Sequence, residues 1–143
     1  MRRLLAALGL ASLVGTAHGA EYAVGQVWTY KTRPGEEAST LQINKIEDYP
    51  KIGRVYHVSV LGVHVRNSKS PQGFTAVLPH FPVSKGTLDN SVVSLTKQQP
   101  RNVGYEAGYA QWKQAIDAGS GGVFTITVAE IVDFAEKALS QSP

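Results

Sequence analysis

The chain has 143 residues, no cysteine and a formal net charge of +3. The absence of cysteine excludes disulfides, catalytic thiols, thiolate zinc sites and iron–sulfur clusters, so the folded chain must be held together by its apolar core. The basic residues are not gathered with aromatic residues into a patch, and this distribution argues against nucleic-acid binding.

The N-terminus has the order of residues found in a secretory signal peptide. Two arginines follow the initial methionine, an apolar run occupies residues 4–14, and small residues lead to Gly19. The run is shorter than the roughly 20 residues that a membrane-spanning helix needs. We therefore expect a cleaved signal peptide over residues 1–19 (a cut after Ala20 is the alternative) and a single globular domain over residues 20–143. The mature chain would be close to neutral, periplasmic or secreted from a bacterium, and without a stable membrane anchor.

The first half of the mature chain has the pattern of an antiparallel meander. Residues 25–31 alternate in polarity, and the proline and glycine of Arg33–Glu36 predict a reversing turn. Strands are expected over Thr40–Glu47 and, after a turn at Pro50–Gly53, over Arg54–Arg66. Each strand would therefore pair with the one before it.

The segment Arg54–Arg66 does not alternate strictly between apolar and polar residues. A one-residue bulge at Leu61–Gly62 restores the alternation, and glycine within a strand often marks such a bulge. The bulge places Tyr56, Val58, Val60, Val63 and Val65 on one apolar face, and His57, Ser59, His64 and Arg66 on the polar face. The alternative is a strand buried on both faces, in which the two histidines would need hydrogen-bond partners.

The second half of the chain changes to helical patterns. Residues 74–83 contain two prolines and predict a strand at the sheet edge, because proline cannot donate to a ladder. Helices are expected over residues 84–95, 105–118 and 127–138, the last opening with a capping box, and a short returning strand over 123–126. The sequence therefore predicts an α+β fold, with an antiparallel sheet of four to five strands and about three helices packed on one face.

No spacing of residues in the chain identifies a metal centre. His57 and His64 share a strand face but are expected to lie too far apart for direct contact. A metal ion would need a third ligand, such as His80, Glu36 or Glu37. We therefore expect no metal, no cofactor and histidines of ordinary structural or surface character.

Other candidate sites are equally weak in the sequence. Ser59 and His57 are the nearest approach to a nucleophile and its base, but neighbours on one strand face point outward side by side. The glycine run 119–122 follows a helix instead of preceding one, so it does not predict a phosphate loop. The aromatic stripe on the helix of residues 105–118 indicates core packing, with a binding platform as the alternative.

A small exported domain without a catalytic pattern is expected to act by contact. The leading hypothesis is a soluble binding protein without catalytic activity, of immunity or inhibitor type, whose partner is another protein of the cell envelope or a toxin. The alternatives are a small periplasmic hydrolase that uses His57 or His64 with a carboxylate, and a small-ligand carrier with an apolar cavity between sheet and helix. The candidate partner-binding residues are Arg33, Glu36, Glu37, His57, His64 and Arg66.

The chain also resembles a group of small exported bacterial proteins. The resemblance is carried by Gly25-x-x-Trp28-x-Tyr30, by the turn at Arg33–Glu36 and by Ser39-Thr40-Leu41, with Val55-x-His57-Val58 and Pro79-His80-x-Pro82 further along. It covers most of the mature chain and implies export and one folded unit. It implies no activity and no role for any residue.

Overall fold

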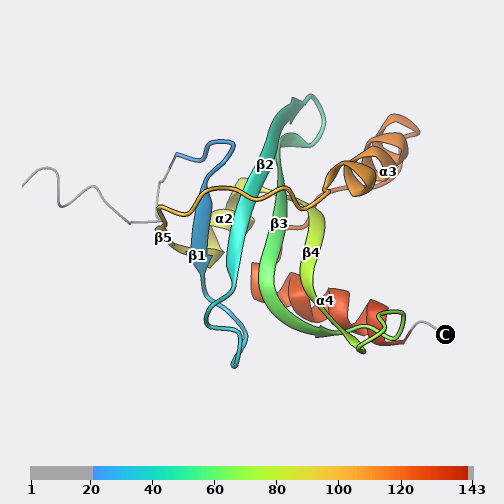
Figure 1. Cartoon of the computed structure of the whole chain (residues 1–143). Coiled ribbons are helices and arrows are strands. Elements are labelled where there is room, and N and C mark those ends of the chain that lie inside the picture. The colour runs from blue at the N-terminus through green and yellow to red at the C-terminus, as the bar shows by residue number, and fades with distance from the viewer. Residues whose placement is uncertain (1–20, 142–143) are drawn as a thin grey trace, which may run out of the picture.

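Five antiparallel strands form one sheet in the order β4-β3-β2-β1-β5 (Figure 1). The computed structural model describes residues 21–141, and the expected signal peptide lies outside them. Strands β1 to β4 follow one another as a meander, whereas β5 returns from later in the chain to pair with β1. The strands are β1 Val27–Tyr30, β2 Thr40–Tyr49, β3 Gly53–Arg66, β4 Phe74–Val83 and β5 Val92–Leu95.

Three helices pack against this sheet, which confirms the predicted α+β fold class. They are α2 Lys85–Ser91, α3 Glu106–Asp117 and α4 Val128–Ser140. The expected caps are present: the Ser84 side chain accepts from Thr87 N–H at the start of α2, and Thr127 with Glu130 forms the capping box of α4. Within residues 21–141, none of the helices has the length and apolar character needed to cross a membrane.

The main core lies between one face of the sheet and the helices α2 and α4. The buried cluster joins Leu41 and Ile43 of β2 to Leu88 of α2 and Ile131 of α4. The five β3 residues expected on the apolar face also belong to this cluster: Tyr56, Val58, Val60, Val63 and Val65. The fully buried side chains of this cluster make it the principal source of stability.

The predicted bulge in β3 is confirmed. The pairing of β3 with β4 shifts register between Leu61 and Val65. Gly62 has φ +78°, and a side chain there would lie 3.3 Å from the backbone Cα of Ser39. Only glycine suits both the left-handed conformation and this close approach.

The half of β3 before the bulge is buried on both faces, so the alternative interpretation of this strand also holds in part. All residues from Val55 to Leu61 are buried, whereas beyond Gly62 buried and exposed residues alternate. The second cover comes from α3 and from the segment 96–104, which crosses the other side of the sheet on its way to α3 (Figure 1). Helix α3 therefore contacts the face of β3 opposite to α4, so the expectation that all the helices pack on one face of the sheet was wrong.

Two expectations for the second half of the chain were wrong. The helix expected over 84–95 ends at Ser91, and Val92–Leu95 is strand β5, with Trp28 opposite Leu95 and Tyr30 opposite Val92. Adjacent β-branched valines favour a strand once the edge of β1 is available for pairing. The strand expected over 123–126 is reduced to a single bridge between Val83 and Phe124.

Candidate functional site

A row of hydrogen-bonded titratable side chains crosses β2, β3 and β4. Nε2 of His57 lies 3.0 Å from Oε1 of Glu47, and Nδ1 of His57 lies 2.9 Å from Nε2 of His80. The Tyr109 hydroxyl of α3 donates to Oε2 of Glu47 at 2.8 Å. We call Glu47, His57 and His80 the carboxylate–histidine row.

The row has one arrangement of protons when both rings are neutral. An ionised Glu47 only accepts hydrogen bonds, so Nε2 of His57 carries the proton that it donates. Nδ1 of His57 then accepts from Nε2–H of His80, and Nδ1 of His80 is left as the basic end of the row.

The environment sets the charges of the three groups. Partial burial would raise the pKa of Glu47, but the hydrogen bonds from Tyr109 and His57 outweigh it and hold this pKa below its usual value. Burial lowers the pKa of His57 although Glu47 opposes the shift. Burial, together with the neighbouring His57, lowers the pKa of His80 to about 4. At neutral pH the row therefore consists of one carboxylate and two neutral imidazoles.

Helix α3 covers the middle of the row. The ring of His57 meets the rings of Tyr109 and Trp112 edge-on, with centroids 4.9 Å and 4.8 Å away. The His57 side chain has an exposed fraction of 0%. Gly108 of α3 lies so close to His80 that a Cβ there would be 2.9 Å from the His80 Cβ. A substrate cannot touch His57 while α3 occupies this position, because the ring offers no accessible atom.

Ser59, next to His57 on the strand face, belongs to a separate set of hydrogen bonds. Its hydroxyl donates to the Pro79 carbonyl at 2.6 Å and accepts from Asn44 at 2.7 Å. Asn44 in turn accepts from Gln42, which also exchanges two hydrogen bonds with the backbone of Arg101 in the segment crossing the sheet. These contacts tie the segment to the sheet, and they do not join Ser59 to His57.

The predicted partner-binding residues of the first turn are largely engaged within the chain. Arg33 donates twice to Glu36, at 2.9 Å and 2.7 Å, and also reaches Asp133 and Glu136 of α4. Glu36 is buried and accepts the backbone N–H of His64 at 2.7 Å. These contacts fix the turn against α4 and β3.

Electrostatics favours the charged forms of this ion-pair network. The hydrogen bonds to Glu36 raise the pKa of Arg33 above its already high value. Burial would raise the pKa of Glu36, yet Arg33 and the His64 N–H outweigh burial and lower it. Buried, multiply bonded pairs of this kind stabilise the positions of the segments that carry them.

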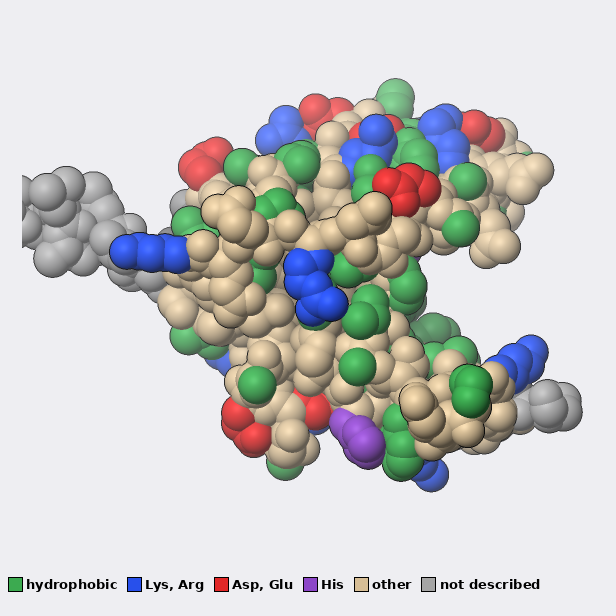
Figure 2. All heavy atoms as spheres, in the orientation of Figure 1, with side chains coloured by type: hydrophobic (Ala, Val, Ile, Leu, Met, Phe, Trp, Pro, Cys, Tyr) green, Lys and Arg blue, Asp and Glu red, His purple; other side chains and the backbone are tan. Residues whose placement is uncertain are grey.

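The remaining predicted residues lie at the surface. His64 is exposed and stacks on Phe74, with ring centroids 3.9 Å apart, and Arg66 pairs with Phe74 across β3 and β4. We call His64, Arg66 and Phe74 the His64 patch. On the face drawn in Figure 2, a histidine lies at the surface beside hydrophobic side chains, and acidic side chains are nearby.

Glu37 is exposed in the first turn. The structure thus separates the six predicted residues: Arg33, Glu36 and His57 turn inward, and Glu37, His64 and Arg66 face outward.

The carboxylate–histidine row was missed because Glu47 was not singled out in the sequence. The turn at Pro50–Gly53 contains the missing signal. It places Tyr49 opposite Gly53. The register then places Glu47 opposite Val55, which lies two residues before His57 on the same strand face. Side chains that are diagonal neighbours on one sheet face are close enough for long polar groups to meet. His80 could not be placed in this way, because the pairing of β3 with β4 is irregular there.

The residues of the row do not form a metal centre. Within residues 21–141 there is no group of three histidine or acidic side chains placed to hold a metal ion. Glu47 and His80 bind opposite nitrogens of His57, so the three groups form a line. A metal ion needs its ligands to converge on one point.

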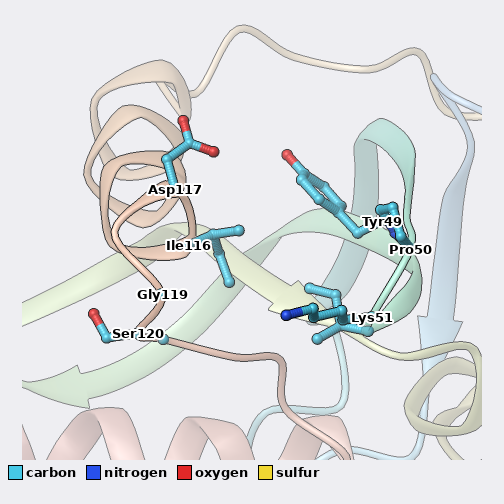
Figure 3. A pocket seen from close by; sticks show the side chains of 9 residues that line it. Tyr49, Pro50, Lys51, Ile116, Asp117, Gly119 and Ser120 are labelled. Atoms are coloured by element: carbon cyan, nitrogen blue, oxygen red, sulfur yellow. The ribbon is translucent and has the colours of Figure 1, made fainter.

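A pocket of about 500 Å³ lies between the turn that joins β2 to β3 and the end of α3 (Figure 3). Tyr49 is part of its wall, and the Tyr49 ring meets Trp112 edge-on at 5.4 Å. We call this cavity the turn pocket. Trp112 therefore contacts both Tyr49 in the wall of the turn pocket and His57.

Comparison with known protein families, with characterised proteins and with solved structures finds no match for the chain. The geometry of its surfaces and buried groups is therefore what supports a function.

Proposed function

We propose that the mature chain is an exported soluble interaction protein without catalytic activity, which binds another protein of the bacterial cell envelope or a toxin. An immunity-type or inhibitor protein is the form of this function that the small domain suits. The observation that carries the proposal is a contrast between two groups of residues. The buried titratable side chains of the carboxylate–histidine row hydrogen-bond to one another, whereas the aromatic and arginine side chains of the His64 patch are exposed at the surface.

The His64 patch has the composition of a protein-binding surface. Phe74 is 39% exposed, and its ring is held by the stack on His64. The Arg66 side chain is 66% exposed and lies beside Phe74 on the neighbouring strand, with its Nε 3.5 Å from the carboxylate of Glu136. Aromatic residues and arginine are enriched at interface hot spots, and a ring that is already immobilised loses little entropy on binding. Strand β4 is an edge of the sheet, so a partner can approach Phe74 from the side.

The structure provides the carboxylate–histidine contact that the hydrolase alternative requires, but a substrate has no access to this contact. His57 has the carboxylate neighbour that the alternative requires, at 3.0 Å. The ring is nevertheless covered by α3, and general base catalysis needs the base within hydrogen-bond reach of the substrate. His64 uses its ring to stack on Phe74. These positions favour binding over catalysis.

The test is capture of a partner by the patch. We would pass envelope extract over immobilised residues 20–143 and identify bound proteins by mass spectrometry. A stoichiometric partner is expected on the unaltered protein, with at least a tenfold loss on the double variant Phe74→Ala, Arg66→Ala. Phe134→Ala is the matched control, since Phe134 is 55% exposed on α4, outside the patch.

Two results would contradict the proposal. Equal capture by the patch variant and the Phe134 control would show that the partner binds elsewhere. Hydrolysis of an ester or amide substrate by the purified protein, lost in His57→Gln while the fold is kept, would replace the proposal with the hydrolase alternative.

A further inference from the structure

The turn pocket is built from two segments that are distant in the sequence. The turn between β2 and β3 supplies one wall, and the end of α3 with the following glycine loop supplies the other (Figure 3). Gly121 allows the loop to close on the helix, because it has φ +87° and a Cβ there would lie 3.3 Å from Ala115. The lining residues are Tyr49, Pro50, Lys51, Ile52, Ile116, Asp117, Gly119, Ser120 and Gly121.

The walls of the pocket are mainly apolar. Ile52 belongs to the wall formed by the turn and Ile116 to the wall formed by α3, and Tyr49 and Pro50 add further apolar surface. Its volume of about 500 Å³ lies within the range of small-molecule sites, which is roughly 300–1,000 Å³. A ligand with one or two aromatic ring systems would replace water against these side chains, which is favourable for apolar surface.

The lining contains one cation, Lys51, and one carboxylate, Asp117, which has a cationic partner outside the lining. The carboxylate of Asp117 is paired with Lys113 at 2.9 Å. The ammonium of Lys51 has no ion pair among the described residues, and its side chain points into the space between the two walls (Figure 3). The Tyr49 hydroxyl donates to Glu47 at 3.3 Å, and Ser120 donates to Ala115 at 3.3 Å. Lys51 is therefore the one lining cation free to bind a ligand among the residues described.

From this combination we infer that the turn pocket binds a small amphipathic organic anion, a carboxylate or sulfonate carried on an apolar body of one or two aromatic ring systems. The apolar body packs between Ile52 and Ile116, and the anionic group pairs with Lys51. This site is independent of the proposed partner binding, because the turn between β2 and β3 lies at the opposite end of β3 from the His64 patch (Figure 1).

Two fluorescent probes with the same ring skeleton test the inference. One is 8-anilinonaphthalene-1-sulfonate, which is anionic, and the other is N-phenyl-1-naphthylamine, which lacks the sulfonate. We expect saturable binding of one sulfonate probe per chain. Lys51→Gln should weaken that probe about tenfold, as expected for a lost charge-assisted contact, and should leave the neutral probe unchanged.

Matched variants separate the site from general effects of charge and stability. Lys69→Gln removes the same charge from the loop between β3 and β4, and it should bind both probes as the unaltered protein does. Ile52→Ser changes a residue that is 36% exposed, so the fold is expected to survive, and it should weaken both probes about threefold or more. The thermal unfolding of each variant shows that it is folded.

Either of two outcomes would overturn the inference. One is the absence of saturable binding of the sulfonate probe to the folded, unaltered protein. The other is an equal affinity of Lys51→Gln and Lys69→Gln for that probe, which would show that Lys51 does not hold the anion. Neither outcome touches the His64 patch, so the partner-binding proposal would stand or fall separately.

Discussion

The two halves of β3 carry the same type of residue into opposite environments. His57 lies before the bulge at Gly62, under α3, and is fully buried between Glu47 and His80. His64 lies beyond the bulge, where none of the helices within residues 21–141 covers that face, and its ring stacks on Phe74 at the surface. The element that covers the strand, and not the residue type, therefore decides whether a histidine lies in the core or at the surface.

The largest expected effect separates the two histidines directly. His57→Ala should lower the free energy of unfolding by about 3 kcal/mol, because it opens a cavity and leaves Nε2–H of His80 without its acceptor. His64→Ala should change it by less than about 0.5 kcal/mol, as is usual for surface positions. Urea denaturation of both variants measures the difference. Equal losses would remove the distinction between the two halves.

A second prediction concerns what holds the exposed half of β3. Glu36→Ala should destabilise the protein by about 2 kcal/mol, because the backbone N–H of His64 and the guanidinium of Arg33 both lose a buried acceptor. Glu37→Ala, on an exposed neighbour, should cost less than about 0.5 kcal/mol. The same denaturation measurement applies. If Glu36→Ala leaves the free energy of unfolding unchanged, the pairing of β3 with β4 stabilises this end of the sheet without help from the turn.

The bulge between the two halves gives a third prediction. Gly62→Ala should cost about 1.5–2 kcal/mol, from the left-handed φ and the 3.3 Å approach to Ser39. Gly35→Ala is the matched control, since Gly35 has φ +88° but nothing lies within 4 Å of its added Cβ. It should cost about 1 kcal/mol. If calorimetry or denaturation shows equal losses of stability for the two variants, the close approach at Gly62 adds nothing to the cost of Gly62→Ala.

The smallest expected effect is a dependence of stability on pH. The pKa of His80 is about 4 in the folded protein and 6.5 when unperturbed, and that of His57 is also lowered. The unfolded chain therefore binds more protons between these values. Stability is then complete above about pH 6.5, declines as the pH falls towards 4, and levels off below 4 for this group.

The expected loss over this range is on the order of 1 kcal/mol, because the His80 ring is partly exposed to solvent. Protonation of Glu47, whose pKa is also lowered, would add a further loss in stronger acid. His80→Gln keeps a donor towards His57 and removes the titration, so its unfolding free energy should vary less with pH. An unchanged pH profile in this variant would remove His80 as the cause.

The fold was largely predictable where the signal is local. The turn at Arg33–Glu36, the bulge at Gly62 and the capping box at Thr127 each depend on a few neighbouring residues, and the structure contains all three. Strand β5 was mistaken for the end of a helix because its identity depends on pairing with β1, which is remote in the sequence. A short apolar segment does not by itself distinguish a strand from a helix.

The candidate site was predictable only in part for the same reason. His57 was identified as a residue of the strand face, but its neighbours come from two other strands and from α3. The turn pocket also joins segments that no local pattern connects. Residues that act across strands become visible only when the register of each pair is known.

The position of β5 has a consequence for the order in which the chain folds. The hairpins from β1 to β4 close over short loops, whereas β5 reaches β1 through contacts such as Thr29 with Ser94, 65 residues apart. Because closing a longer loop costs more entropy, we expect the four-strand meander to form early and β5 to dock late. In native-state hydrogen exchange, the amides of β5 should then exchange faster than those of β3, because β5 can detach from the edge of the sheet while the meander stays folded.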